Sequence, residues 1–190
     1  METNIFKILE VDTKENIHSA FIASIINANP FAREKFVEIL KEKCVREELD
    51  YKKLKASTET VLSSDKSARV DIYLSDFETK NKGNTRIIIE NKLFAGDQKK
   101  QLKKYYDHLE RYDKKALFYL TIEGKDASYY STEGLRDYYR ITYKDDITKW
   151  LNAVKENEEI APKFKTYIDD YLAIIEELSV YNSLLNTGLS

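Results

Sequence analysis

Three residues near the ends of two expected strands have side chains whose types and spacing suit metal-assisted chemistry. Glu90 and Lys92 stand two positions apart directly after the run Ile87-Ile88-Ile89, and Asp71 lies in an earlier segment of alternating apolar and polar residues. In a strand, positions i and i+2 point to the same face, so Glu90 and Lys92 should project side by side. If the strand of Asp71 pairs beside them, two carboxylates share one place, and a divalent cation between them removes their repulsion.

The chemistry expected of this set is the activation of water against a phosphate. Oxygen ligands without cysteine favour Mg²⁺ or Mn²⁺ over zinc, and the sole cysteine, Cys44, falls at core spacing in a helix. Lys92 could hold or deprotonate the water, or offset the charge that builds in the transition state. The alternative is a structural Asp–Lys or Glu–Lys ion pair buried at a strand end.

The Glu-Xaa-Lys spacing occurs three times, so the spacing alone decides little. Glu78-Thr-Lys80 lies in a polar segment and is typical of solvated surface. Glu123-Gly-Lys125 follows an apolar strand, but Gly124 suits a turn and no strand-borne aspartate precedes it at hairpin distance. The copy at Glu90 combines Asp71, the apolar triplet and a following helix that contains Gln and Tyr.

The elements that must position these residues alternate between helices and strands. Apolar spacing and β-branched runs predict helices at 17–28, 31–44, 97–111, 147–154 and 164–185, and strands at 58–62, 69–74, 86–92, 116–122 and 140–143. This order predicts an α/β fold with a central mixed sheet of four to five strands flanked by helices. We found no repeat or linker, so we expect one domain over 1–190, with a C-terminal helical segment from about 144.

Two further acids are candidates for a supporting role. A hairpin centred on Asp65 pairs positions whose numbers sum to 130, which sets Glu59 opposite Asp71, although a one-residue slip would turn Glu59 away. Glu15 could reach the site from the first helix; the alternative is a first-turn acid favoured by the helix dipole.

The helix expected after Lys92 supplies polar and basic candidates. Gln101 and Tyr105 share one helix face, although Tyr105 could equally be an ordinary core residue.

The overall charge of the chain is close to neutral. It has 31 Lys+Arg and 33 Asp+Glu, a net charge of 31 − 33 = −2, which speaks against a polybasic nucleic-acid binder. Yet segment 99–115 has seven basic and three acidic residues, whereas 156–177 has seven acidic and two basic ones. The basic segment lies where a phosphate backbone would pass, unless it is only a solvated helix face; its nucleic-acid-binding candidates are Lys99, Lys100, Lys103 and Lys104.

Hydropathy, histidines and tyrosines give further expectations about location and binding. No apolar stretch approaches the roughly 20 residues of a membrane span, and the first residues lack a secretory signal, so we expect no membrane and a cytoplasmic location. His18 and His108 are interpreted as packing or surface residues rather than ligands. Fourteen tyrosines include three doublets; stacking on unpaired bases is one use, especially for Tyr129 and Tyr130, and half-buried aromatic packing is the alternative.

Asp71 followed by Glu90-Asn91-Lys92 on successive strands resembles the PD-(D/E)XK nuclease superfamily, whose fold is restriction-endonuclease-like. The segment IIIENKLFAGDQKKQLKKYY is similar to a bacterial branch with Ile-Glu-Asn-Lys, a short loop and a Gln-Leu-Xaa-Xaa-Tyr helix. The resemblance covers most of the chain and thins after Trp150. One departure is Val70, which stands where the family pattern has proline.

The resemblance implies a Mg²⁺-dependent nuclease, with Mn²⁺ as a substitute, that hydrolyses phosphodiester bonds of DNA. Asp71, Glu90 and the backbone carbonyl of Asn91 would hold the metal, and Lys92 would act on the attacking water. Gln101 and Tyr105 would line the site near the DNA backbone. The alternative is a catalytically weak or inactive module of the same fold that binds nucleic acid or a partner protein, for instance in phage defence. The sequence itself supports neither a protein partner nor a homo-oligomer.

Overall fold

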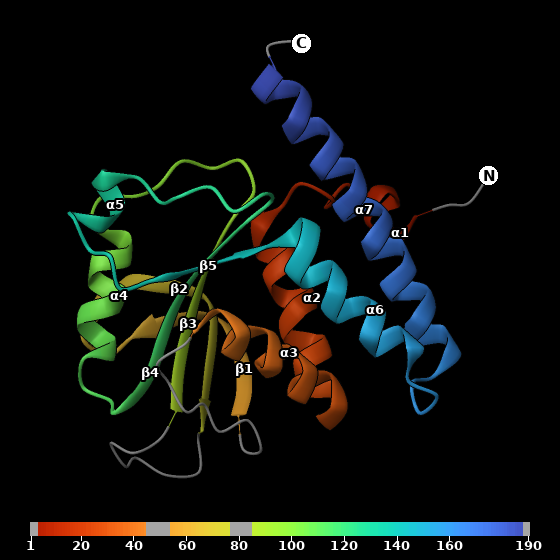
Figure 1. Ribbon diagram of the computed structural model, residues 1–190, viewed down its shortest axis with the longest axis horizontal. Coiled ribbons are helices and arrows are strands. Elements are labelled where there is room, and N and C mark those ends of the chain that lie inside the picture. Colours follow the sequence, from red (N-terminus) through yellow and green to blue (C-terminus); the bar gives the residue numbers. More distant parts are fainter. Residues whose placement is uncertain (1–3, 45–53, 77–84, 188–190) are drawn as a thin grey trace.

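The computed structural model describes residues 4–44, 54–76 and 85–187, and its five strands form one mixed sheet (Figure 1). The first three strands pair antiparallel, and the last two are added in parallel. Their order in the sheet follows the sequence: β1 (Leu54–Leu62), β2 (Asp65–Asp76), β3 (Thr85–Lys92), β4 (Lys114–Thr121) and β5 (Tyr139–Thr142). The predicted mixed α/β fold with a sheet of four to five strands is therefore confirmed.

Helices cover both faces of the sheet, but unequally. One face is covered by α4 (Gln101–Leu109), with α5 (Tyr129–Thr132) beside the start of α4 (Figure 1). The other face packs against a larger group of helices: α1 (Ile5–Ile8), α2 (Glu15–Ala28), α3 (Pro30–Lys43), the π-helical turn η1 (Tyr143–Ile147), α6 (Thr148–Glu156) and α7 (Pro162–Thr187). None of the helices in the described segments is both long and apolar enough to cross a membrane.

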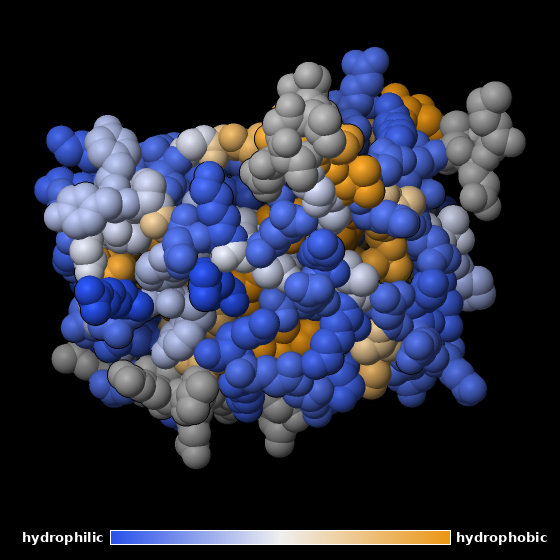
Figure 2. Space-filling model, turned by 45° about the horizontal axis from the view of Figure 1, so that its top comes forward, coloured by the Kyte–Doolittle hydropathy of each residue, from blue (hydrophilic) through white to orange (hydrophobic). Residues whose placement is uncertain are grey.

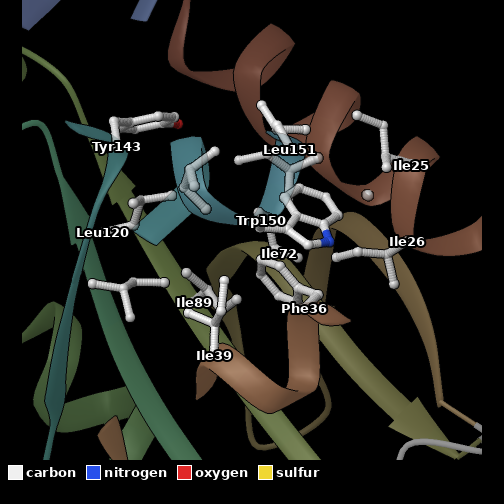
Figure 3. Packing of buried hydrophobic residues seen from close by; sticks show 14 of the residues in the cluster. Ile25, Ile26, Phe36, Ile39, Ile72, Ile89, Leu120, Tyr143, Trp150 and Leu151 are labelled. Atoms are coloured by element: carbon white, nitrogen blue, oxygen red, sulfur yellow. The ribbon is translucent and has the colours of Figure 1, made fainter. Parts of the chain in front are cut away.

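The larger core is organised around Trp150 of α6. Figure 3 shows its indole lying among side chains of α3 and of the sheet. The indole ring centre is 4.7 Å from that of Phe36, and the indole nitrogen donates a hydrogen bond of 2.8 Å to the backbone oxygen of Ala32. A fully buried tryptophan with its one donor satisfied is a strong anchor, because truncating such a residue costs about 3–5 kcal/mol.

Local sequence explains where several elements begin. The Asn29 side chain accepts hydrogen bonds from the backbone nitrogens of Phe31 (2.7 Å) and Ala32 (3.4 Å), and Pro30 occupies the first turn, so α3 starts there. The helix predicted at 97–111 begins only at Gln101, because Lys100 adopts a left-handed conformation with φ of 58°. The Glu-Xaa-Lys sequence at Glu78-Thr-Lys80 lies outside the described residues.

The hairpin of β1 and β2 has the predicted register. Partners from Leu54 with Asp76 to Val61 with Arg69 have numbers that sum to 130, and the register shifts only between Val61 and Leu62. Because pairing continues into β3, with Ile72 opposite Ile89, the Asp71 position meets the end of β3.

Candidate active site

Three neighbouring strands bring the predicted charged residues together on the face covered by α4. Ile72 lies opposite Ile89, so the next step of the ladder sets Asp71 beside Glu90, and Glu90 pairs in turn with Tyr119 of β4. The backbone nitrogen of Asn91 donates a hydrogen bond of 2.8 Å to Asp71 Oδ2. The side chain of Asp71 is therefore fixed next to the Glu90–Lys92 segment.

Glu90 is fully buried without ordinary hydrogen-bond partners. Its exposure is 0%, and within the described segments neither carboxylate oxygen accepts a hydrogen bond of regular geometry. Lys92 Nζ contacts Oε1 as an ion pair at 2.7 Å. Burial, followed by the nearby charge of Asp71, raises the pKa of Glu90 well above its usual value. Burial likewise raises the pKa of Asp71, against the hydrogen bond from Asn91.

Lys92 lies between two carboxylates at the mouth of the site. Its ammonium is 2.7 Å from Glu90 Oε1 and 3.9 Å from Glu15 Oε2, and the side chain is nearly buried. Burial is the largest single effect and lowers the pKa of Lys92, but the carboxylates of Glu90, Glu15 and Asp71 together outweigh burial, so the pKa of Lys92 is raised. A charged donor is therefore held at the edge of the acidic pair.

The donor set fits a hard divalent cation. The Glu90 carboxylate, of which only Oε1 is paired with Lys92, lies beside the Asp71 carboxylate, and carboxylate oxygens are the ligands that Mg²⁺ and Mn²⁺ prefer. Across the described segments, no three histidine, cysteine, aspartate or glutamate side chains gather as a ready metal cluster. A cation here would depend on two carboxylates together with backbone, water or phosphate oxygens, as Mg²⁺ sites commonly do.

Glu15 reaches the site, but mainly through the loop that follows β3. Its Oε1 accepts hydrogen bonds from three consecutive backbone nitrogens, those of Leu93 (2.7 Å), Phe94 (3.3 Å) and Ala95 (3.2 Å). Glu15 is also the first residue of α2, where the helix dipole favours an acid. It therefore anchors this loop while its second oxygen faces Lys92.

Glu59 occupies the strand position opposite Asp71, but its carboxylate pairs elsewhere. Its backbone has a positive φ of 52°, and the exposed carboxylate forms an ion pair of 3.2 Å with Arg69. Glu59 therefore pairs with Arg69 at the surface instead of facing Asp71 as a second negative charge. Both residues still line the same pocket.

A pocket of about 460 Å³ opens beside the acidic pair. Gln101 and Tyr105 of α4 both line it, so they share a helix face, as their spacing predicted, and lie where the family resemblance placed them. The Tyr105 hydroxyl donates to the backbone oxygen of Arg69 at 2.5 Å and receives a bond of 3.3 Å from the Gln101 amide. Tyr105 is also part of the smaller core, so both interpretations of this residue hold. The remaining candidates on the pocket wall are Glu15, Glu59, Asp71, Lys92, Lys99 and Lys104.

The four candidate lysines differ in their surroundings. Lys99 and Lys104 line the pocket, and Lys104 also pairs with Asp65 at 3.0 Å. Lys103 pairs with Asp107 one turn along α4, and Lys100 pairs with Glu133 at 2.8 Å. Such exposed pairs contribute about 0–1 kcal/mol, so these lysines can exchange their partners for phosphates.

Sequence reasoning missed the role of the Asn91 side chain. Asn91 alternates with Glu90 and Lys92, so it points to the opposite, helix-rich face of the sheet. There its Oδ1 accepts from the Tyr143 hydroxyl at 2.8 Å, and its Nδ2 donates to Ser19 Oγ and to the Glu15 backbone oxygen, both at 3.0 Å. The period of two predicts this orientation, but Tyr143 lies too far along the chain for any local pattern to indicate it.

The competing motif at Glu123 is used for structure. Its carboxylate accepts hydrogen bonds from Asn182 (2.9 Å) and Ser183 (3.0 Å) of α7 and pairs with Lys144 at 3.4 Å. Gly124 has a positive φ of 83°, as the expected turn requires. This copy of Glu-Xaa-Lys therefore fastens the end of α7.

Comparison with known proteins agrees with this geometry. A family model described as the PD-(D/E)XK nuclease superfamily matches residues 3–173. We found no match to the chain among curated proteins or among solved structures. Members of the superfamily generally use divalent metals, membership suggests nuclease activity, and the five-stranded mixed sheet agrees with the restriction-endonuclease-like fold. The chain therefore belongs to the PD-(D/E)XK nuclease superfamily.

Proposed function

We propose that this protein is a Mg²⁺-dependent deoxyribonuclease that hydrolyses phosphodiester bonds of DNA at the pocket beside Asp71, Glu90 and Lys92. The observation that carries the proposal is the fully buried Glu90 carboxylate next to a second acid: Lys92 pairs with Oε1 at 2.7 Å, and Oε2 accepts no hydrogen bond from the described residues. A buried charge in this state is costly for folding and is explained by a ligand that needs it.

Asp71, Glu90 and the backbone carbonyl of Asn91 would hold the metal. When bound, the cation would supply Lewis-acid stabilisation of the charged phosphate and make water a stronger nucleophile. The acids themselves lie on neighbouring strands, fixed by the hydrogen bond from the Asn91 nitrogen to Asp71. This rigidity keeps the oxygen donors in place before DNA arrives.

Lys92 would orient the attacking water and offset charge on the phosphate. Water adds to phosphorus as the bond to the leaving oxygen breaks, and the leaving oxygen takes up a proton. The raised pKa of Lys92 keeps the ammonium charged beside Glu90, so it can donate a hydrogen bond where negative charge develops. Lys99 and Lys104 on the pocket wall would bind flanking phosphates of the DNA backbone.

A cleavage assay with matched substrates tests the proposal. The purified protein is incubated with circular DNA, linear DNA and RNA in Mg²⁺, in Mn²⁺ and in chelator. We expect DNA to be cut in either metal and left intact in chelator. Cleavage of RNA alone, or of DNA at full rate in chelator, would contradict the assignment.

Metal binding separates this proposal from an inactive module of the same fold. Titration calorimetry with Mn²⁺ should show binding to the parent chain and a loss of at least about tenfold in affinity for Asp71→Asn, because one carboxylate donor is removed. Glu59→Gln, an exposed acid of the same pocket, is the matched control. No Mn²⁺ binding to the parent chain would favour the inactive module.

A further inference from the structure

The chain has three tyrosine doublets, and one of them is presented to solvent. Tyr129 is 76% exposed and Tyr130 is 57% exposed. In the other doublets, Tyr105 is buried, and the rings of Tyr138 and Tyr139 pack against Tyr119 and Phe118 with centroids 6.3 and 5.5 Å apart. Half-buried packing therefore explains those doublets but leaves Tyr129 and Tyr130 without a structural reason.

The helix that carries the exposed doublet is fastened to the rim of the candidate active site. The Lys100 nitrogen donates to the Tyr130 backbone oxygen at 2.8 Å, and the Ser128 nitrogen donates to Asp97 Oδ2 at 2.6 Å. The ion pair of 2.8 Å between Lys100 and Glu133 adds a third link. Lys99, the residue before this junction, lines the pocket, so α5 is attached to the chain directly beside the pocket wall.

One ring of the doublet, that of Tyr129, lies beside the turn that ends its own helix. A carbon added at Gly134, which has a positive φ of 88°, would lie 3.7 Å from Tyr129 Cε2, so this ring lies against the turn that ends α5. An aromatic side chain held on a short, hydrogen-bonded element loses little further entropy on binding a flat ligand.

The surroundings of the doublet favour nucleic acid over protein. Exposed polar residues adjoin it on both sides, including Lys125, Asp126 and Glu133, so the two rings do not belong to a wide apolar patch of the kind that protein partners cover. Figure 2 shows the side of the molecule that carries α4 and α5 as mainly blue and white. Lys99 lines the pocket next to this junction, and Lys100 and Lys104 could exchange their exposed partners Glu133 and Asp65 for phosphates of a nucleic-acid backbone.

We propose that Tyr129 and Tyr130 form a stacking surface for unpaired bases of DNA whose backbone enters the pocket beside Lys99. Aromatic rings next to a basic groove are the usual means of binding single strands, because every base has a π-face. The inference rests on the proposed function and deepens it: the substrate has a single-stranded segment near the bond that is cut.

Binding measured without cleavage tests this inference. Lys92→Ala serves as the parent, in chelator, and fluorescence anisotropy gives its affinity for a single-stranded oligonucleotide and for a blunt duplex. Added to this parent, Tyr129→Ala/Tyr130→Ala should weaken single-strand binding by at least about fivefold, since stacking contributes about 1–3 kcal/mol per base. The duplex should lose less than twofold.

Two further variants keep the result interpretable. Tyr129→Phe/Tyr130→Phe retains the rings and should bind the single strand like the parent. Tyr181→Ala, an exposed tyrosine of α7, controls for loss of a surface ring and should also bind normally. Unchanged single-strand affinity in the double alanine variant, or an equal loss on the duplex, would overturn the stacking surface. Because no cleavage is measured, either result leaves the nuclease proposal to its own assay.

Discussion

At the scale of single residues, Glu90 holds a buried charge that the fold compensates only in part. The carboxylate is fully buried, its pKa is raised by burial and by Asp71, and only the ion pair with Lys92 offsets it. An acid whose pKa is raised on folding destabilises the native state at neutral pH. Such residues are typical of functional sites, where stability is sacrificed for activity.

Glu90→Gln should therefore abolish cleavage and raise the melting temperature. The amide keeps the shape of the side chain but carries no charge to desolvate, and it can donate a hydrogen bond to Asp71. Differential scanning calorimetry checks the stability, with Glu59→Gln as the exposed control that should melt like the parent chain. A melting temperature well below that of the parent would show that Glu90 is a structural ion-pair partner.

Tyr143→Phe should reduce activity through Asn91. The variant leaves the buried Asn91 oxygen without its 2.8 Å donor, at a cost of about 1–3 kcal/mol, and loosens the residue between Glu90 and Lys92. The control is Tyr171→Phe, which removes a neighbouring buried hydroxyl that contacts His18 and the Tyr143 side chain rather than Asn91. Both variants should lose stability in denaturant unfolding, but only Tyr143→Phe should lower kcat. Equal kcat values in the two variants would contradict a positioning role.

How far the site could be predicted depends on the range of the interactions. Asp71, Glu90 and Lys92 were brought together by strand period and hairpin register, which are local rules. Glu59 has the predicted register yet turns to Arg69, because its left-handed backbone redirects the side chain. The support from Tyr143 depends on tertiary packing that no local pattern encodes.

At the scale of elements, α4 carries the charge that should contact DNA. Lys99→Ala and Lys104→Ala should each weaken duplex binding and lower the slope of log K against log salt by about 0.9, the value for one lost phosphate contact. Lys103→Ala is the control, since Lys103 precedes Lys104 on α4 but, unlike Lys99 and Lys104, is not among the residues that line the pocket. An equal slope change in all three variants would assign the effect to overall charge.

The contact between α2 and α7 makes stability depend on pH through His18. Its Nε2 is 2.9 Å from the Asp12 backbone oxygen, which can only accept, so Nδ1 accepts from the Tyr171 hydroxyl, also at 2.9 Å. Burial lowers the pKa of His18 below its ordinary value of 6.5, although nearby Asp12 opposes this. The unfolded chain therefore binds a proton that the folded chain does not, and His18 stabilises less as pH falls below 6.5.

His18→Gln should consequently flatten the decline in unfolding free energy between pH 7 and pH 5. Glutamine can donate and accept at similar positions but does not titrate. Urea unfolding of parent and variant at each pH isolates the difference that belongs to His18, whatever other groups titrate in this range. Parallel curves for parent and variant would contradict a neutral, buried His18.

Element boundaries were predictable where capping and periodicity agreed. Asn29 and Pro30 separated the two predicted helices at 17–28 and 31–44, and the run Arg86-Ile-Ile-Ile-Glu-Asn-Lys92 predicted β3 within one residue. The polar helix was predicted four residues too early, because Asp97 binds the Ser128 nitrogen and the Tyr119 hydroxyl across the fold instead of starting a helix. Long-range hydrogen bonds of this kind override local helix preference.

At the scale of the whole molecule, one face of the sheet packs the larger core and the other carries the candidate active site. The face toward α2, α3, α6 and α7 contains the larger apolar core, whereas the face toward α4 contains the acids, Lys92 and the basic pocket wall. The net charge of −2 conceals this arrangement, because the acidic residues of 156–177 lie on the α7 side. Arg69, Lys92, Lys99 and Lys104 thus lie on the face where the proposed substrate would bind, together with the acids of the pocket wall.

The central claim is tested most directly by comparing two lysines that share a motif. Lys92→Ala and Lys125→Ala each remove the lysine of a Glu-Xaa-Lys sequence that follows an apolar strand, but only Lys92 contacts the buried acids. DNA cleavage is measured in Mg²⁺ with the parent chain and both variants, all shown to be folded by circular dichroism. We predict at least about a hundredfold loss for Lys92→Ala and parent-like cleavage for Lys125→Ala. Full Mg²⁺-dependent cleavage by Lys92→Ala would contradict the account.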